Sequence, residues 1–127
     1  MIKPIILSVA LFFSNQSLSN ESFVRLDTVN IFSIGNNGFI GEISDGEKIY
    51  KKESKKESAY NFFISIANNE KSTPESKLYA ACYLKERYPK KSLGKNKKTK
   101  VSVLKGDVLR VYYFYDIYNN ILKNGCN

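Results

Sequence analysis

The sequence predicts a mainly α-helical protein, a small bundle of three to four short helices with a minor β element, and leaves an α+β fold as the alternative. Three observations support this. Residues 72–89 carry the start and stop signals of one buried helix, and two capping-box patterns precede them. Among the later segments, residues 101–104 alternate in the manner of a short strand.

Length and composition allow one globular domain. The chain has 127 residues, of which 43% are hydrophobic and 25% charged, and its formal net charge is +8. We therefore expect a targeting segment over residues 1–19, followed by a single mainly helical domain over residues 20–127.

Residues 1–19 have the organisation of a secretory signal peptide. Lys3 supplies a positive charge, residues 4–13 form the apolar stretch, and Ser17 and Ser19 give a small-residue cleavage pattern. The apolar stretch is shorter than the roughly 20 residues that cross a bilayer, so the mature form should have no transmembrane span. Cleavage would place the protein in the periplasm or outside the cell. A buried N-terminal helix and an uncleaved anchor are the alternatives.

The segment 20–43 is undecided, because its apolar residues fit either a helix or an irregular strand. Its end, residues 33–41, contains three glycines and two asparagines, a composition typical of turns. A glycine loop that cradles an anion is the functional alternative, but the strand–loop–helix pattern of a phosphate loop is missing.

Two capping-box patterns predict the next two helices. Ser44-Asp-Gly-Glu47 should start a short helix that ends near Lys52, and Ser54-Lys-Lys-Glu57 should start a second helix over about residues 55–68. The tight connection to the following helix predicts an antiparallel or steeply crossed pair. The second helix should bury one apolar face, made of Ala59, Phe62, Phe63, Ile66 and Ala67.

The following helix is the best defined. Thr73 is a suitable N-cap, Pro74 fits the first helical position, and Glu75 places a negative charge at the positive end of the helix dipole. Pro89 prevents continuation beyond the C-terminal end. Apolar residues recur between them at helical spacing: Leu78, Ala81, Cys82 and Leu84.

A basic connector over residues 89–100 should be exposed, since its composition cannot form a core. The basic stretch from Lys85 to Lys100, which includes this connector, could attract nucleic acid, anionic lipid or acidic glycans. Few arginines and aromatics are interleaved there, which argues against specific nucleic-acid recognition. The candidate surface for an anionic partner comprises Lys90, Lys91, Lys95, Lys97, Lys98 and Lys100, and a merely solvated loop is the alternative.

The C-terminal part begins with a predicted strand over residues 101–104 and a turn over residues 105–107. Residues 108–123 fit a helix by spacing and length, although residues 111–115 alone are strong strand formers. We expect the helix, closed by Gly125. Its tyrosines could form either an interaction face or part of the core.

The two cysteines, Cys82 and Cys126, indicate one disulfide, because an even count behind an export signal is typical of oxidising compartments. The bond would attach the C-terminal end to the central helix. The alternative is a buried free thiol at Cys82 and a free cysteine in the tail at Cys126.

Several chemistries are excluded because the chain has no histidine. Catalytic triads that use histidine and histidine metal sites cannot form, and a local Cys-x-x-Cys pair is absent. We therefore expect no cofactor, no metal and no catalytic residue. The remaining option is carboxylate chemistry, for which the acids near the turns are Glu42, Asp45, Glu47, Asp107 and Asp116, but their spacing fits surface and capping roles equally well.

The run Thr73–Leu84, TPESKLYAACYL, resembles a segment of a family of small bacterial exported proteins. Those proteins share a "TPEGKLYALCGL" helix, a preceding G-x-x-S-x-G-E turn, which matches Gly41–Glu47 here, and a late cysteine. The resemblance covers about residues 35–126, but Tyr83 stands where glycine is common. It implies export and a disulfide between Cys82 and Cys126, and it implies no activity.

These observations predict an exported binding protein whose partner is another protein or an anionic envelope component. A role as an inhibitor or immunity protein would use a rigid basic surface to cover an acidic active site. The alternatives are a carboxylate-dependent hydrolase of envelope polymers and an envelope protein without a dedicated partner.

Overall fold

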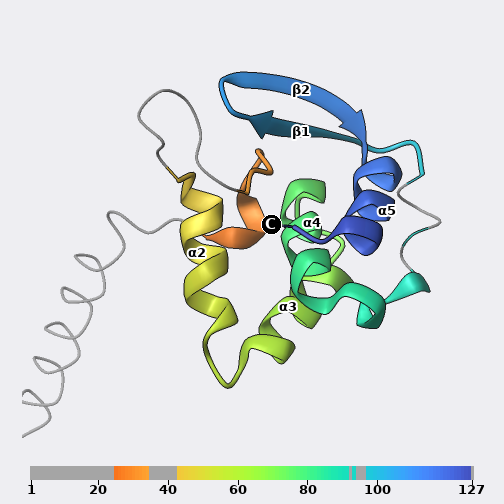
Figure 1. Ribbon diagram of the computed structural model, residues 1–127. Helices are drawn as coiled ribbons and strands as arrows, with labels where there is room; N and C mark the ends of the chain where they lie inside the picture. Colours follow the sequence, from red (N-terminus) through yellow and green to blue (C-terminus); the bar gives the residue numbers. More distant parts are fainter. Residues whose placement is uncertain (1–24, 35–42, 92, 94–96, 127) are drawn as a thin grey trace, which may run out of the picture.

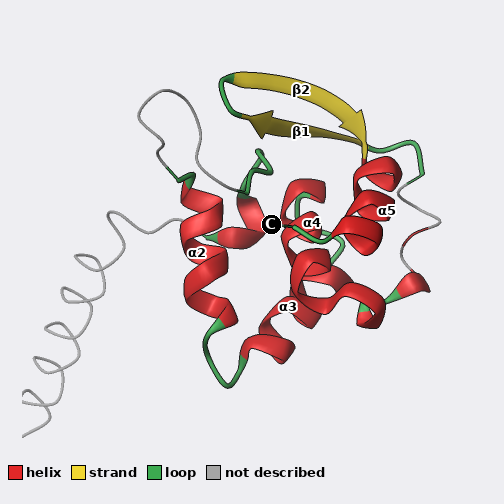
Figure 2. Cartoon of the chain, in the orientation of Figure 1, coloured by secondary structure: helices red, strands yellow, loops and turns green. Residues whose placement is uncertain are grey.

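A computed structural model describes residues 25–34, 43–91, 93 and 97–126 of the chain. Over these residues the fold is mainly helical, with four α-helices and one two-stranded antiparallel sheet (Figures 1 and 2). The predicted helical bundle with a minor β element is thus confirmed. The predicted targeting segment 1–19 and most of the predicted glycine turn lie outside the described residues.

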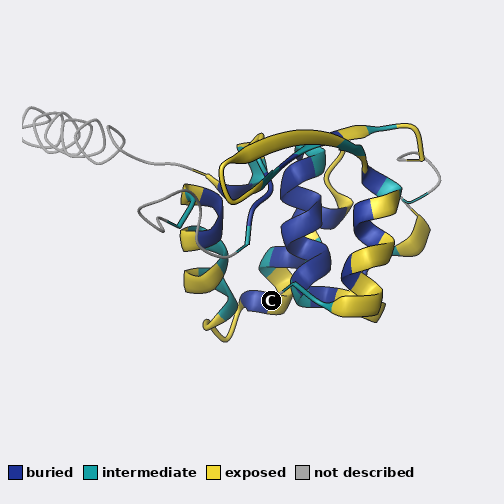
Figure 3. Cartoon of the chain, turned by 45° about the horizontal axis from the view of Figure 1, so that its top comes forward, coloured by how far each residue is buried: buried dark blue, intermediate teal, exposed yellow. Residues whose placement is uncertain are grey.

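Helix α4, Pro74–Leu84, is the centre of the fold, and it packs against α3, Ala59–Asn68, and α5, Phe114–Asn124. All of its residues except Pro74 and Tyr83 are buried, so it has no solvent face (Figure 3). Its start agrees with the prediction, since the Thr73 hydroxyl accepts a hydrogen bond from the Ser76 N–H at 3.2 Å. A helix enclosed on all sides must be covered by the other elements.

The end of α4 differs from the prediction. The helix stops at Leu84, five residues before Pro89, because Lys85 takes a backbone φ of 52°. A short 3-10 turn, η2, follows over Lys85–Arg87. Tyr83, the next-to-last residue of α4, stacks its ring on Phe63 of α3 with centroids 4.7 Å apart.

Helix α2, Asp45–Ser54, begins as predicted, because the Ser44 side chain accepts a hydrogen bond from the Glu47 N–H. The prediction that the second capping pattern, Ser54–Glu57, starts a helix was wrong. Ser54 is still part of α2, where its hydroxyl donates to the Lys51 carbonyl at 3.0 Å, and α3 begins only at Ala59. A serine hydroxyl that bonds back to the preceding turn cannot cap a following helix. Four of the five predicted core residues of α3 are buried, and Phe62 is half-buried.

The N-terminal segment, undecided from the sequence, forms a 3-10 turn, η1, over Leu26–Thr28 and then runs beside strand β1, Lys100–Lys105. The Phe32 N–H donates to the Ser102 carbonyl at 2.9 Å, and the Leu104 N–H donates to the Phe32 carbonyl at 3.0 Å. These two bonds make an isolated parallel bridge between Phe32 and Val103. The first described residues therefore cover one edge of β1.

The predicted helix over residues 108–123 was wrong in its first third. Residues Val108–Tyr113 form strand β2, which pairs with β1. A turn in which Gly106 has a φ of 58° connects the two strands. The helix, α5, starts only at Phe114. The β-branched and aromatic side chains of this segment favour an extended backbone, and β1 supplies the hydrogen-bonding partner that realises it.

The predicted disulfide is present. Cys82 of α4 and Cys126, which follows α5, are bonded with their Cα atoms 5.7 Å apart and are separated by 44 positions in the chain. The bond returns the end of the chain to the central helix (Figure 1). It joins two elements that also pack directly on each other.

A glycine substitution tests the packing of α2 on α4. A Cβ atom on Gly46 would lie 2.8 Å from the Tyr79 hydroxyl oxygen and 2.9 Å from its ring. Gly46→Ala should gain up to about 1 kcal/mol of helix propensity, yet we expect a net loss of about 1–3 kcal/mol from overpacking. Urea denaturation measures this change, with the exposed Lys48→Ala as the control. A stabilised Gly46→Ala variant would contradict the close approach.

Candidate protein-binding surface

The β1–β2 hairpin exposes large apolar side chains. Val108, Leu109, Val111 and Tyr113 of β2 have 48%, 54%, 62% and 48% of their surface exposed, and they are four of the six exposed large hydrophobic residues in the described part of the chain. Figure 3 shows β2 as an exposed ribbon along the outside of the molecule. Contiguous exposed apolar residues are typical of interaction sites.

The strand register explains how this face is built. Residues paired across an antiparallel sheet lie on the same face. Val101 and Val103 of β1 are buried, so their partners Tyr112 and Arg110 share the inner face. By the same alternation Lys105 and Val108 are on the inner face, and the outer face combines Lys100 with Tyr113, Ser102 with Val111, and Leu104 with Leu109.

The two edges of the sheet differ. On the β1 side, the Ser102 N–H donates to the Glu75 carboxylate at 2.8 Å, and the Ser102 carbonyl accepts from Phe32. Because Ser102 directs both groups away from β2, Ser102 and Val111 form a non-hydrogen-bonded pair. The backbone groups of Val111, and those of Leu109 by the same alternation, therefore point to the outer edge of β2. No described residue bonds to them there.

Both faces of the hairpin carry positive charge, with Lys100 on the outer face and Arg110 and Lys105 on the inner face. The hairpin carries Lys100, Lys105 and Arg110 against a single acid, Asp107. The Lys100 ammonium lies 6.0 Å from the centroid of the Tyr113 ring, and the Lys105 ammonium lies 5.7 Å from that of Tyr112. The ion pairs found among the described residues involve none of these cations. The outer face therefore has apolar side chains beside Lys100, and the other two cations of the hairpin lie on its inner face.

The lysines predicted to bind an anionic partner are distributed along the connector. Five of the six are exposed and one, Lys95, lies outside the described residues. Lys90 and Lys91 follow η2, whereas Lys97 and Lys98 precede β1, and only Lys100 belongs to the hairpin. The sequence did not reveal Leu109, Arg110 and Val111 as part of a surface, because their spacing predicted a helix. The signal that could have found them is the Lys105–Asp107 turn between two strand-forming runs.

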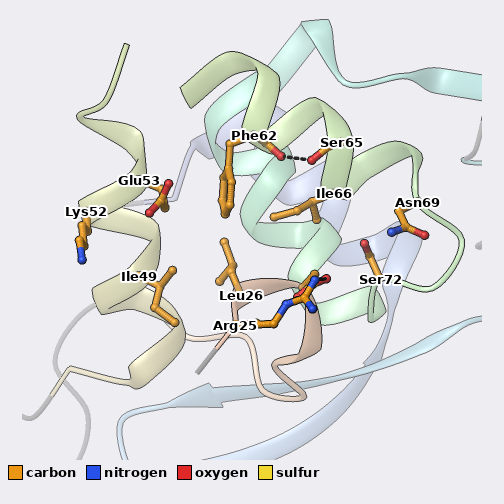
Figure 4. A pocket seen from close by; sticks show the side chains of 11 residues that line it. Arg25, Leu26, Ile49, Lys52, Glu53, Phe62, Ser65, Ile66, Asn69 and Ser72 are labelled. Atoms are coloured by element: carbon orange, nitrogen blue, oxygen red, sulfur yellow. Dashed lines mark hydrogen bonds and ion pairs between the residues drawn. The ribbon is translucent and has the colours of Figure 1, made fainter. Parts of the chain in front are cut away.

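A cavity of about 400 Å³ lies between η1, α2 and α3 (Figure 4). Apolar side chains, including Leu26, Ile49 and Ile66, face this space. Its two carboxylates already have partners, since Asp27 pairs with Arg25 at 2.7 Å and Glu53 pairs with Lys56 at 2.7 Å. The cavity is therefore a mainly apolar hollow whose acids are engaged by neighbouring cations.

The acids considered for carboxylate chemistry are not gathered at this cavity. Asp45, Asp107 and Asp116 are exposed on three different elements, and Glu47 is buried with its carboxylate 3.1 Å from the Lys51 ammonium. None of these four lines the cavity, and Glu42 lies outside the described residues. The described structure thus offers the hydrolase hypothesis no pair of facing carboxylates among these candidates.

Comparisons with known proteins give no further assignment. No protein-family model matches the chain, and searches of curated proteins and of solved structures find no match. None of the described helices has the length and apolar character needed to cross a membrane.

Proposed function

We propose that this protein is an exported binding protein that holds an acidic partner protein through its β1–β2 hairpin. The single observation that carries the proposal is the exposed apolar strand β2, whose outer edge is open at Leu109 and Val111. Export is supported by the signal-like residues 1–19 and by the Cys82–Cys126 disulfide, which is compatible with an oxidising compartment.

The chemistry of the hairpin favours a protein over the other anionic partners. Protein interfaces combine apolar side chains with polar ones at their margin, and the hairpin offers Leu109, Val111 and Tyr113 with Lys100 on one face and Arg110 on the other. A glycan or nucleic acid would use the cations and leave the aliphatic side chains in water. The net charge of +8 would steer an acidic partner toward this protein.

An inhibitor or immunity role is the form of binding that we favour. Inhibitors act by presenting a rigid segment to an active site, because an ordered segment loses little conformational entropy on binding. The hairpin meets this requirement, since β1 is fixed to α4 through Glu75 and to the N-terminal segment through Phe32. A basic rigid hairpin would suit an acidic active site.

Photo-crosslinking tests the proposal. A photoreactive amino acid at Val111 of the full-length, disulfide-bonded protein should capture an acidic protein from the envelope fraction, identified by mass spectrometry. Rebinding of the purified partner should weaken with added salt. We expect Arg110→Glu to lower its affinity at least about tenfold, because like charges then face each other. Lys48→Glu, at an exposed position of α2 outside the hairpin, is the matched control.

Three results would contradict the proposal. One is capture of only lipid or glycan, and another is equal affinity of the Arg110→Glu variant and the wild type. The third is a loss of affinity in a Lys90→Glu/Lys91→Glu variant together with full affinity in Arg110→Glu, since that result would place the binding surface on the connector.

A further inference from the structure

We infer that the partner binds by adding an extended strand to the outer edge of β2, and that this added strand alternates apolar and acidic side chains. The inference rests on the proposed function, because it specifies how the same surface engages its partner. It depends on three features of the hairpin: the free backbone edge, the lack of protection at that edge, and the different character of its two faces.

The backbone of β2 is ready to accept another strand. The N–H and carbonyl groups of Leu109 and Val111 point away from β1, and no described residue bonds to them. Peptides that extend an existing sheet gain their affinity from such main-chain groups and their specificity from alternate side chains. The opposite edge is not available, because Phe32 and Glu75 bond to it.

The usual protection of an edge strand is weak here. Natural proteins block exposed edges with proline, bulges, very short strands or several charged side chains. Strand β2 pairs with β1 over six consecutive residues without a bulge, contains no proline, and has Arg110 as its only charged residue. An edge that is both apolar and unblocked would promote aggregation unless a partner covers it.

The two faces of β2 specify the side chains of the added strand. Neighbouring strands place directly opposed residues on the same face, where they contact each other. On the outer face the added strand meets Leu109, Val111 and Tyr113, so its residues there should be apolar. On the inner face of β2 the residues are Val108, Arg110 and Tyr112, with Lys105 of β1 beside them, so the residue opposite Arg110 should be acidic.

A second copy of this chain fits the edge less well. An antiparallel pairing of two β2 strands about Val111 would bring two basic hairpins together, each with Lys100, Lys105 and Arg110. Like charges on adjoining strands destabilise a sheet, and the whole chain already carries a net charge of +8. An acidic segment from a different protein removes this repulsion.

A peptide of alternating glutamate and valine, about eight residues long, is the probe for this binding mode. Fluorescence anisotropy with the disulfide-bonded protein should show saturable binding, and the corresponding lysine–valine peptide should not bind. In the wild-type protein, amide NMR shifts should change at Leu109 and Val111. Absence of binding by the glutamate–valine peptide, or equal binding of the lysine–valine peptide, would overturn the inference.

Val111→Pro removes the backbone donor at the centre of the edge and leaves the β1–β2 ladder unbroken, since the Val111 N–H does not bond to β1. We expect it to weaken peptide binding at least about tenfold, while Val111→Thr, which keeps the N–H, should bind within about twofold of the wild type. Near-UV circular dichroism and the melting temperature show whether each variant is folded. Equal binding of the folded Val111→Pro variant would overturn strand addition.

Backbone methylation of the probe gives a test that leaves the protein unchanged. In an antiparallel arrangement, the residues that share hydrogen bonds with Leu109 and Val111 are the valines of the peptide. N-methylated valines should therefore abolish binding, whereas N-methylated glutamates should preserve it, and a parallel arrangement reverses the two results. Equal effects of the two methylations would overturn strand addition.

The two proposals fail in different ways. If the captured partner still binds Val111→Pro but not Arg110→Glu, the strand-addition inference is wrong and the proposed binding function stands. If Arg110→Glu binds the captured partner as well as the wild type does, the proposed function is wrong. A dimer in sedimentation velocity that Val111→Pro dissociates would assign the edge to a second copy and overturn the acidic strand.

Discussion

Replacing both cysteines, as Cys82→Ala with Cys126→Ala, should lower the free energy of unfolding by about 4 kcal/mol. The disulfide joins residues separated by 44 positions, so it strongly restricts the unfolded chain. It also holds the C-terminal end of α5 near α4. Urea denaturation of the variant and of the wild type under oxidising conditions measures the difference.

Reduced wild-type protein is the matched control for this experiment. Cys82 is buried, with 3% of its surface exposed, so its replacement by alanine also removes some packing. Reduction opens the same loop and leaves both side chains in place. If the reduced and oxidised proteins have equal free energies of unfolding, the stabilising role of the disulfide is wrong.

Tyr79→Ala should cost about 3–5 kcal/mol, the range for removal of a large buried aromatic ring. Tyr79 is fully buried, and its ring centroid lies 4.8 Å from that of Phe32 and 5.7 Å from that of Tyr50. It therefore joins α4 to both α2 and the N-terminal segment. Urea denaturation measures the loss, and a cost near that of an exposed substitution would contradict this central position.

Tyr79→Phe isolates the contribution of the hydroxyl group. The Tyr79 hydroxyl accepts a hydrogen bond from the Ser33 N–H at 3.0 Å and donates one to the Ser33 carbonyl at 2.8 Å. Ser33 is itself buried, so loss of the hydroxyl removes two hydrogen bonds to buried backbone groups. We expect Tyr79→Phe to cost about 1–3 kcal/mol, less than the alanine variant.

The free energy of unfolding should depend on pH differently in the wild type and in Tyr79→Phe. Burial is the largest cause that raises the pKa of Tyr79 above its ordinary value of 10.0. The unfolded chain therefore loses this proton at lower pH than the folded chain, so the free energy of unfolding falls as pH rises above about 10. Tyr79→Phe should show a shallower fall between pH 9 and 11 than the wild type. Parallel curves would contradict this assignment.

The sequence predicted the parts of the fold that depend on neighbouring residues. The start of α4 follows from Thr73 and Pro74, and the start of α2 follows from Ser44, because a cap needs only groups within one helical turn. The cysteine count indicated the disulfide that the structure contains. The predicted turn before β2 is present, since Gly106 readily takes a positive φ.

The candidate surface was only partly predictable. The sequence predicted an exposed basic region, and five of its six lysines, including Lys100, are exposed. It did not reveal the apolar residues Leu109 and Val111 as exposed, since apolar residues at helical spacing predict a buried face. Their exposure follows from pairing with β1, whose other side is occupied by Phe32, a residue about 70 positions earlier in the chain.

By itself, the sequence determined the mainly helical class, the central helix and its start, and the residues able to form a disulfide, because short-range capping, spacing and composition decide these. Tertiary structure decided the conformation of those segments in which a long-range partner overrides the local preference. It made residues 108–113 a strand by supplying β1. It also gave Glu75 a second role, as the acceptor that fixes β1 to α4. A segment with two comparable local preferences adopts the one whose backbone groups find partners in the folded chain.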